Sequence, residues 1–303
     1  MAIDVDWKRR QAQPASPTSE GANVPDRQYT RFRLVRNGAV LRVVFDHPPM
    51  NLFDQTMISE CSALLDFLRA DRSVRVVLFS SAGPDFFLGH ADLSLFLAPR
   101  EGVPPKPVRL TLLQDLFERL RTVPQATIAV VEGRATGAGV ELVTSCDMAF
   151  AARGRAVLTL FETAVGVLPG ATGTQRLPRL MGRQRSLEFI LGCQDFDTDL
   201  AERYGVVNRA FDATELWPFV ENLAQRIGTF PSEAIAMNKV AVDASEHPLA
   251  VGLLEETHAL DHALATGEGQ RRMAALLELG AQTPEFELRK FTAALATLGG
   301  SDD

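Results

Sequence analysis

GRATGAGVEL, residues 133–142, forms a glycine-rich turn between two predicted regular elements. The apolar run at residues 127–131 precedes it, and a segment able to start a helix follows it. Small residues let a ligand approach the main chain, and the first N–H groups of a helix have no partner within that helix. Such a turn can hold the phosphates of a nucleotide or an oxygen that becomes negatively charged during a reaction.

The nucleotide interpretation requires residues that this turn lacks. Leu142 stands where the third glycine of a dinucleotide fingerprint would allow close helix packing, and no Gly-Lys-Ser/Thr of a phosphate-binding loop follows. The sequence therefore favours an oxyanion hole, in which main-chain N–H groups and the helix dipole stabilise a developing enolate oxygen. A second donor is needed, and SSAGPDFFLGHADL at residues 80–93 again suggests a strand, a small-residue loop and a helix.

Composition and charge narrow the class of protein. The chain has 303 residues, of which 46% are hydrophobic, so we expect a globular protein with a full core. The formal net charge is -7 and no long Lys/Arg block occurs, so we expect neither nucleic acid nor a membrane surface as a partner. The expected partner is a small molecule or another copy of the chain.

Targeting signals and cysteine usage favour the cytoplasm. The first residues contain no apolar signal-peptide core, and no stretch of about 18 apolar residues occurs in the chain. Cys61, Cys146 and Cys193 lie far apart without C-x-x-C spacing, which suits neither a zinc site nor a disulfide framework. We therefore expect a cytoplasmic protein in a reducing compartment.

The order of predicted elements indicates three regions. Residues 1–27 are rich in Pro, Ser and Gln without periodicity and are expected to form a disordered tail. Residues 28–230 open with two strands around Asn37-Gly38, a dipeptide typical of tight hairpin turns, and continue with alternating helices and apolar strands. The pattern is helical from residue 213 onward, so residues 231–303 are expected to form a helical oligomerisation region.

The alternation predicts an α/β layered core with right-handed crossovers. A helix is expected from Asp54, its N-cap, to Ala70. The expected strands are 29–35, 39–45, 74–80, 127–131, 147–151 and 206–210, and the further expected helices of the core are 110–121, 139–146, 174–181 and 185–191.

Four motifs resemble, in order and spacing, those of the crotonase (enoyl-CoA hydratase/isomerase) superfamily. They are VVLFSSAGPDFFLGHADL (76–93), VPQATIAVVEGRATGAGVELVTSCDMAFAA (123–152), LFETAVGVLPGATGTQRLPRLMGRQRSLEFILGC (160–193) and AERYGVVNRAF (201–211). The resemblance implies a crotonase-like ββα spiral core with a helical C-terminal trimerisation region. It also implies a homotrimer or a hexamer built as a dimer of trimers, and a coenzyme A thioester substrate whose enolate is held by two main-chain N–H groups.

The resemblance assigns the two N–H donors. In the family's F-x-x-G-x-D pattern, residues 87–92 align without a gap, so Ala91 would be the first donor, while His90 stands where the family has glycine. An alternative register would make His90 itself the donor. In the family's G-G-G-x-E-L pattern, Ala138 would be the second donor. Substrate contacts are expected at Gly89, His90, Asp92, Gly137 and Gly170.

The resemblance also assigns two catalytic carboxyl groups. Hydration of an enoyl thioester needs a proton taken from water and a proton delivered to the α-carbon, which two carboxyl groups beside one water can perform. Glu141 matches the family's glutamate after the glycine turn, and Glu162 matches the glutamate of the next motif, although Phe161 replaces its proline. We expect Glu162 to protonate the α-carbon and Glu141 to orient and deprotonate the water. Apolar neighbours are expected to raise the pKa of Glu162.

The function implied is that of an enoyl-CoA hydratase-like lyase, with coenzyme A as part of the substrate, no separate cofactor and no metal. The alternatives are another acyl-CoA enzyme of this fold, such as a double-bond isomerase, a decarboxylase or a hydrolase, or a non-catalytic family member acting as a binding or scaffold subunit. Leu93-Ser94-Leu95 stands where many members have a lysine for the coenzyme A phosphates. Candidate replacements are Arg271, Arg272, Arg289 and Lys290.

Overall fold

The computed structural model describes residues 29–97 and 105–283, together with residues 286, 289, 290, 293–295 and 298, so the tail predicted for residues 1–27 lies outside the described part. Its main layer is a six-stranded sheet with the order β1-β2-β3-β5-β7-β10. All neighbouring strands are parallel except β1 and β2, which form the predicted antiparallel hairpin. The strands are β1 (Phe32–Asn37), β2 (Val40–Phe45), β3 (Val76–Ser81), β5 (Ala126–Val131), β7 (Met148–Ala152) and β10 (Arg209–Phe211).

A second sheet of four short strands has the order β4-β6-β8-β9. Its strands are β4 (Phe86–Leu88), β6 (Arg134–Thr136), β8 (Val157–Thr159) and β9 (Phe196–Asp197). Strands β3, β5 and β7 of the main sheet are each followed in the chain by one strand of the second sheet and then by a short helix. The chain therefore advances as a spiral of strand, strand and helix, which confirms the predicted core.

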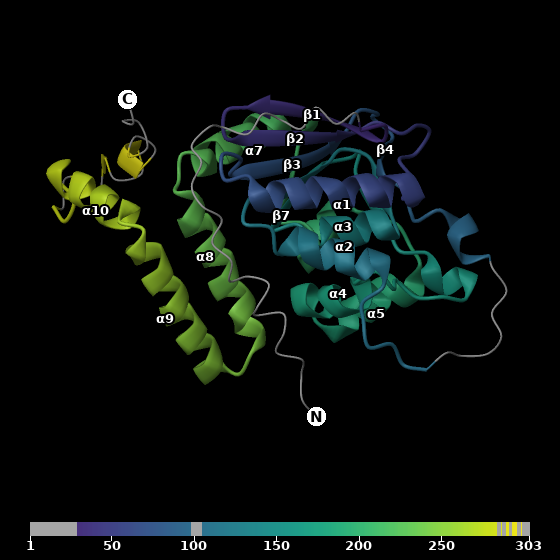
Figure 1. The fold of residues 1–303 in the computed structure, drawn as a ribbon. Coiled ribbons are helices and arrows are strands. Elements are labelled where there is room, and N and C mark those ends of the chain that lie inside the picture. Colours follow the sequence, from purple (N-terminus) through teal and green to yellow (C-terminus); the bar gives the residue numbers. More distant parts are fainter. Residues whose placement is uncertain are drawn as a thin grey trace.

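Helices cover both faces of the six-stranded sheet (Figure 1). On one face, α7 (Ala213–Gly228) packs Leu216 and Val220 against strand residues such as Ile128. On the other face, α1 (Gln55–Ala70) belongs to the main hydrophobic core, and its N-cap Asp54 accepts a hydrogen bond from Met57 N as predicted. The other helices are α2 (Leu112–Arg121), α3 (Ala138–Val143), α4 (Gly173–Met181), α5 (Arg183–Gly192), α6 (Thr198–Tyr204), α8 (Ser232–Asp243), α9 (Leu249–Ala265) and α10 (Glu268–Glu278), with the 3₁₀ turns η2 (Leu93–Phe96), η3 (Glu162–Val165) and η4 (Ala244–Glu246).

One predicted strand, residues 206–210, begins later than its apolar pattern suggested. Val206 and Val207 are buried, but their N–H groups donate to Ala201 O and so close the end of α6. Pairing with β7 starts at Asn208, whose side-chain oxygen accepts from Ala149 N while its own N–H donates to Ala149 O. The strand is therefore limited to residues 209–211 because the preceding amides serve the helix instead.

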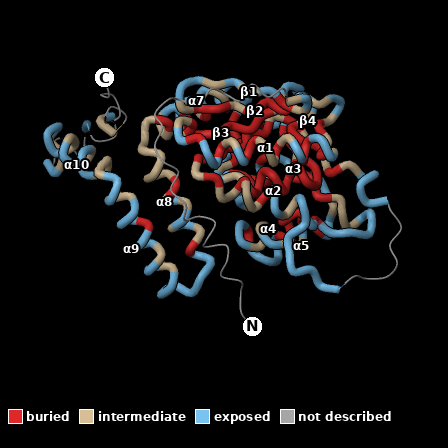
Figure 2. Tube along the Cα trace, in the orientation of Figure 1, coloured by how far each residue is buried: buried red, intermediate tan, exposed pale blue. Residues whose placement is uncertain are grey.

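The C-terminal helices form an arm that extends away from the core (Figure 1). Much of the arm is exposed along α9 and α10, whereas the buried residues concentrate between the sheets and helices of the core (Figure 2). Leu249 and Leu254 of α9 are exposed to 78% and 73%. A helical C-terminal region is thus present as predicted. Within residues 29–97 and 105–283 and the few described beyond them, no helix has the length and apolar character needed to cross a membrane.

Lys239 fastens the first helix of the arm, α8, to the core. Its Nζ atom lies 2.8 Å from Asp147 Oδ2 and donates to the carbonyl oxygens of Val123 (2.7 Å) and Gln125 (2.8 Å). The same carboxylate oxygen accepts from Thr127 N and Oγ1. Asp147 therefore accepts hydrogen bonds from Thr127, and it also forms an ion pair with Lys239 of a distant helix. Both charged side chains are largely removed from solvent, at 14% and 22% exposure.

We expect Lys239→Met to lower the free energy of unfolding by about 2 kcal/mol or more, because it removes the cationic partner of a partly buried carboxylate and the donor to two carbonyl groups. Chemical denaturation measures the change. The double variant Lys239→Met, Asp147→Asn serves as the control and is expected to recover part of the loss, since no charge is then left unpaired. A single-variant loss below about 0.5 kcal/mol, the range of ordinary surface substitutions, would contradict this account of the arm's attachment.

Candidate active site

Glu141 lies in the first turn of α3, and only 3% of the residue is exposed. Its Oε1 atom accepts hydrogen bonds from three consecutive main-chain N–H groups, those of Ala171 (2.8 Å), Thr172 (2.9 Å) and Gly173 (2.7 Å). We call these three residues the carboxylate cradle. The cradle leads into α4, where the first N–H groups have no partner within the helix. The carboxylate predicted from the glycine turn is therefore held by a second, distant segment.

Burial shifts the proton equilibrium of Glu141. Removal from water disfavours the charged form and raises the pKa of the Glu141 carboxyl to about 7. The cradle N–H groups oppose this rise, and the negative charge of Glu162 adds to it. A pKa near neutral pH suits a carboxyl group that exchanges protons under ordinary conditions.

The cradle is tightly built. Thr172 has a φ of 152°, a conformation that residues other than glycine rarely adopt. A Cβ atom on Gly173 would lie 3.1 Å from Glu141 Oε1 and 2.9 Å from Pro169 Cβ. From the sequence we expected a substrate contact at Gly170 and assigned no binding role to residues 171–173, so their binding of Glu141 was missed. A run of small residues directly before a predicted helix was the available signal.

Glu162 opens the 3₁₀ turn η3 and is partly buried. Burial raises the pKa of the Glu162 carboxyl, as predicted, while the nearby His90 side chain acts in the opposite direction. Among the described residues, no group donates a hydrogen bond to Glu162 Oε2, although this atom is buried. A buried carboxylate oxygen without a partner is costly, and such atoms are often retained for function.

The structure brings Glu162, His90 and the glycine turn together at Gly137. A Cβ atom added to Gly137 would lie 2.8 Å from Glu162 Oε1, 3.0 Å from His90 Cβ and 3.4 Å from the Phe161 ring. The His90 and Phe161 rings also contact each other, with centroids 5.0 Å apart. His90 and Phe161 both depart from the family pattern described above, and their rings pack against each other beside the turn.

The two proposed N–H donors are both free of protein acceptors within the described residues. Ala138 is the first residue of α3, so its N–H has no helical partner. Ala91 forms a parallel bridge with Phe53, in which His90 O accepts from Phe53 N. Because a trans peptide directs its C=O and N–H oppositely, the Ala91 N–H points away from Phe53. The Ala91 carbonyl group points to the same side as the Ala91 N–H, and its oxygen accepts a hydrogen bond from His90 Nδ1 at 2.8 Å.

The loops that carry these donors are in direct main-chain contact. A Cβ atom on Gly139 would lie 2.2 Å from Leu88 O and 3.0 Å from Gly89 O, which leaves no room for any side chain. Gly137 likewise lies against His90. The turn at residues 137–139 and the segment at residues 88–90 therefore touch, and this contact brings the Ala91 and Ala138 regions to one place.

The other predicted substrate contacts have local structural partners. Gly89 N donates to Met50 O at 2.9 Å. Asp92 caps η2, because its Oδ1 atom accepts from Ser94 N at 2.9 Å. Gly170 O accepts from the side-chain amide of Gln114 in α2 at 3.0 Å. The main chain of Gly170 lies directly before the cradle, so this residue belongs to the support of Glu141.

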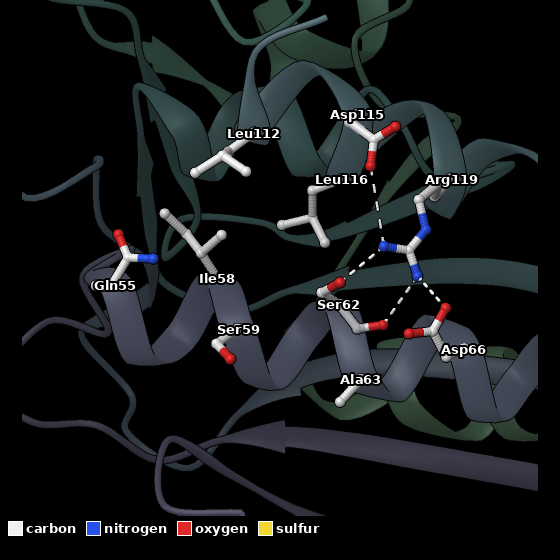
Figure 3. Close-up of a pocket in the computed structure, with 10 residues that line it drawn as sticks. All are labelled: Gln55, Ile58, Ser59, Ser62, Ala63, Asp66, Leu112, Asp115, Leu116 and Arg119. Atoms are coloured by element: carbon white, nitrogen blue, oxygen red, sulfur yellow. Dashed lines mark hydrogen bonds and ion pairs between the residues drawn. The ribbon is translucent and has the colours of Figure 1, made fainter.

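A cavity of about 380 Å³ lies between α1 and α2 (Figure 3). Neither Glu141 nor Glu162 lines it. Arg119 stands at one end, and both terminal nitrogens of its guanidinium interact with Ser62, Asp66 or Asp115 (Figure 3). The cavity is therefore a feature of the α1–α2 contact and separate from the two glutamates.

Two of the basic residues suggested for binding the coenzyme A phosphates, Arg271 and Arg272, form ion pairs within the protein. Arg271 and Arg272 both pair with Glu268, and Arg272 also donates to Thr229 O at 3.0 Å. Their guanidinium groups thus contribute to the structure of the arm. In the part of the chain that the structure describes, no group of three or more His, Cys, Asp or Glu side chains could hold a metal ion.

Comparison with known protein families identifies one that spans most of the chain. The family model described as Enoyl-CoA hydratase/isomerase matches residues 35–286. This match includes the glycine turn, both glutamates and the cradle, and it extends through α8 to α10.

Individual relatives agree with this match. A human protein named enoyl-CoA hydratase domain-containing protein 2, mitochondrial, is 35% identical over 243 residues, covering 78% of this chain and 81% of its own. The short-chain-enoyl-CoA hydratase of Clostridium acetobutylicum is 27% identical and covers 81% of this chain and 94% of its own. Among solved structures, an enoyl-CoA hydratase from Bacillus anthracis superposes with a TM-score of 0.75 at 27% identity, covering 82% of this chain and 96% of that one.

We expect Gly139→Ala to lower the free energy of unfolding by about 2 kcal/mol or more, because the new methyl group would collide with the Leu88 carbonyl and separate the two loops. Thermal and chemical denaturation measure the change. Gly83→Ala is the matched control, since a Cβ atom at Gly83 meets nothing within 4 Å. Equal free energies of unfolding for the two variants would contradict a tight contact between Gly139 and the Leu88 carbonyl.

We expect Glu141→Gln to raise the free energy of unfolding at pH 8 by about 1 to 3 kcal/mol. The folded-state pKa, about 7, exceeds the ordinary value of 4.5, so burial of the charge destabilises the native protein above pH 7. This cost disappears as the pH falls below 4.5, where the group is protonated in both states. Glutamine keeps an oxygen for the cradle without the charge. Denaturation at pH 8 and pH 4 checks this, and a gain of equal size at both values would contradict it.

Proposed function

Because the chain belongs to the enoyl-CoA hydratase/isomerase family, we propose that it is a hydratase-like lyase that adds water across the double bond of a 2-enoyl-CoA thioester. The substrate is an acyl-CoA small molecule, and coenzyme A enters only as part of it. The protein works without a separate cofactor or metal. The family match supports the acyl-CoA chemistry, and the arrangement of the two glutamates supports hydration in particular.

The observation that carries this proposal is the pair of unlike carboxyl groups at one turn. Glu141 has one oxygen saturated by three N–H donors, so its other oxygen is presented in a defined orientation. Glu162 has a buried oxygen without a described partner. Repulsion between two close carboxylates favours a state in which one carries a proton and the other is charged. In that state, the charged carboxylate can accept a proton from water and the protonated carboxyl can donate one to the α-carbon.

The proposed reaction uses these groups as follows. The thioester oxygen accepts hydrogen bonds from the N–H groups of Ala91 and Ala138, which stabilise the negative charge that develops there. Ionised Glu141 removes a proton from a water molecule as its oxygen bonds to the β-carbon. Protonated Glu162 delivers its proton to the α-carbon, and the enolate collapses to a 3-hydroxyacyl thioester. One proton then passes from Glu141 to Glu162 to restore the starting state.

The oligomeric state proposed is a homotrimer or a dimer of trimers, with residues 28–230 as the catalytic core and residues 231–303 as the assembly region. The exposed leucines of α9 support an apolar interface there, because large exposed apolar surfaces are rarely left open in solution. Phosphate groups of coenzyme A would bind at basic side chains of this chain or of a neighbouring copy.

We expect Glu162→Gln and Glu141→Gln each to lower kcat/KM for crotonyl-CoA by about 10² to 10⁴, because each removes one proton-transfer group. Loss of absorbance of the conjugated thioester follows the reaction, and mass spectrometry of an acyl-CoA panel must detect the gain of one water. A product of unchanged mass would instead indicate a double-bond isomerase, and a released free acid would indicate a hydrolase. Full activity in both variants would end the hydratase assignment.

A further inference from the structure

Helix α2 touches the segment around the carboxylate cradle at two points. Near its start, Gln114 Nε2 donates to Gly170 O at 3.0 Å, directly before the cradle. One helical turn later, Glu118 pairs with Arg176, which lies three residues after the cradle in the first turn of α4. Residues four apart share one face of a helix, so Gln114 and Glu118 present a single polar edge to the cradle segment. The two contacts bracket the three N–H groups that bind Glu141.

Each contact is fixed by further bonds. The Gln114 side chain also forms a capping box with Thr111, because its Oε1 atom accepts from Thr111 N at 3.0 Å while Thr111 Oγ1 accepts from Gln114 N at 3.3 Å. The Gln114 amide is thus held at its oxygen and donates from its nitrogen. Since the orientation of the amide is set by the helix cap, the position of Gly170 follows that of α2.

Arg176 depends strongly on Glu118. Only 12% of the Arg176 side chain is exposed, and among the described residues its Nε atom has no hydrogen-bond partner. Glu118 therefore supplies the carboxylate that such a buried guanidinium requires. Glu118 also pairs with Arg121 at 3.2 Å, which keeps its side chain directed along the same surface.

The cradle needs such external support for a geometric reason. Three successive N–H groups converge on one oxygen only if the main chain adopts an unusual path, and Thr172 has a φ of 152° to achieve it. A strained segment relaxes unless its surroundings hold it. Gly170 and Arg176 are the points at which α2 holds this segment from either side of the strained residue.

We propose that Gln114 and Glu118 are positioning residues that hold the carboxylate cradle in place, so that Glu141 presents its free oxygen to the reacting water in one orientation. This inference rests on the proposed function for its effect on the reaction, but the cradle geometry itself does not. Neither side chain is assigned a contact with the substrate. Gln114 acts through the main-chain carbonyl of Gly170, and Glu118 acts through the side chain of Arg176.

Two variants test the proposal, and they change the charge of α2 in opposite directions. Glu118→Gln keeps the size of the side chain but removes the carboxylate from Arg176. Gln114→Glu keeps an acceptor for Thr111 N, and hence the cap, but cannot donate to Gly170 O. Arg119→Gln is the matched control, because Arg119 lies on the same helix and bonds to Ser62 and Asp66 of α1 instead.

We expect both variants to lower kcat by about tenfold with KM within about twofold of the unmodified protein, because a slightly displaced base still permits binding but slows the reaction. The Arg119→Gln control is expected to keep kcat. The acid limb of the pH profile provides a sharper readout. A loosened cradle donates weaker hydrogen bonds to ionised Glu141, which raises the pKa of the Glu141 carboxyl. The acid limb of the pH profile therefore moves to higher pH.

The direction of this pH shift separates positioning from simple charge effects. Glu118→Gln removes a negative charge and Gln114→Glu adds one, so a purely electrostatic influence on Glu141 would move the acid limb in opposite directions. A displaced cradle moves it upward in both. The other titratable groups that face the site, Glu162 and His90, are unchanged in all variants. Shifts of opposite sign would overturn the proposal.

A measurement without substrate tests the cradle directly. Hydrogen exchange of the peptide that contains residues 171–173 is expected to be faster in Glu118→Gln and Gln114→Glu than in the unmodified protein or Arg119→Gln, because weakened N–H bonds open more often. Unchanged exchange with unchanged kcat would overturn the proposal. If the unmodified protein hydrates no enoyl-CoA, the proposed function fails, whereas the exchange result still decides whether α2 supports the cradle.

Discussion

The convergence of three main-chain N–H groups on one buried oxygen, Glu141 Oε1, is the interaction on which the site depends. It joins two segments that are about thirty residues apart in the chain and lie in successive turns of the spiral. A buried carboxylate without such donors would be strongly disfavoured in its charged form. The cradle partly offsets this cost and leaves the carboxyl with a pKa of about 7, close to the range in which proton transfer is efficient.

Close main-chain packing is the second constraint, and it explains the residue types of the glycine turn. Gly139 lies against the Leu88 carbonyl and Gly137 lies against His90 and Glu162, so neither position has space for a side chain. Ala138, between them, keeps its N–H free, which agrees with the alanine found there instead of glycine. His90 and Phe161 also depart from the family pattern, and their rings contact each other in an edge-to-face arrangement.

Charged side chains connect this site to the C-terminal arm. Arg176 pairs with Glu118, Glu118 with Arg121, and Arg121 with Asp243 at the end of α8. Arg179 of α4 also pairs with Glu246 of η4 at 3.2 Å. Helix α4 is therefore linked through ion pairs to the end of α8 and to η4. Burial of part of this network makes its geometry more exacting than that of surface ion pairs.

The residue pattern predicted an α/β core, and the resemblance to the crotonase superfamily predicted its spiral arrangement and pointed to Glu141 and Glu162, which the structure places beside neighbouring loops of one region. Periodicity and the Asn37-Gly38 turn are local signals, and they predicted the hairpin, the strands of the six-stranded sheet and most helices of the core within a few residues. The four short strands of the second sheet were not predicted. The strand at residues 206–210 was misplaced because its first amides bond to α6, a competition that local pattern does not reveal. Long-range packing brings the N–H groups of residues 171–173 to Glu141, places Gln114 and Glu118 of α2 against Gly170 and Arg176, and brings Lys239 to Asp147. These contacts join residues far apart in the chain, and their geometry depends on how the layers pack rather than on the residue types alone.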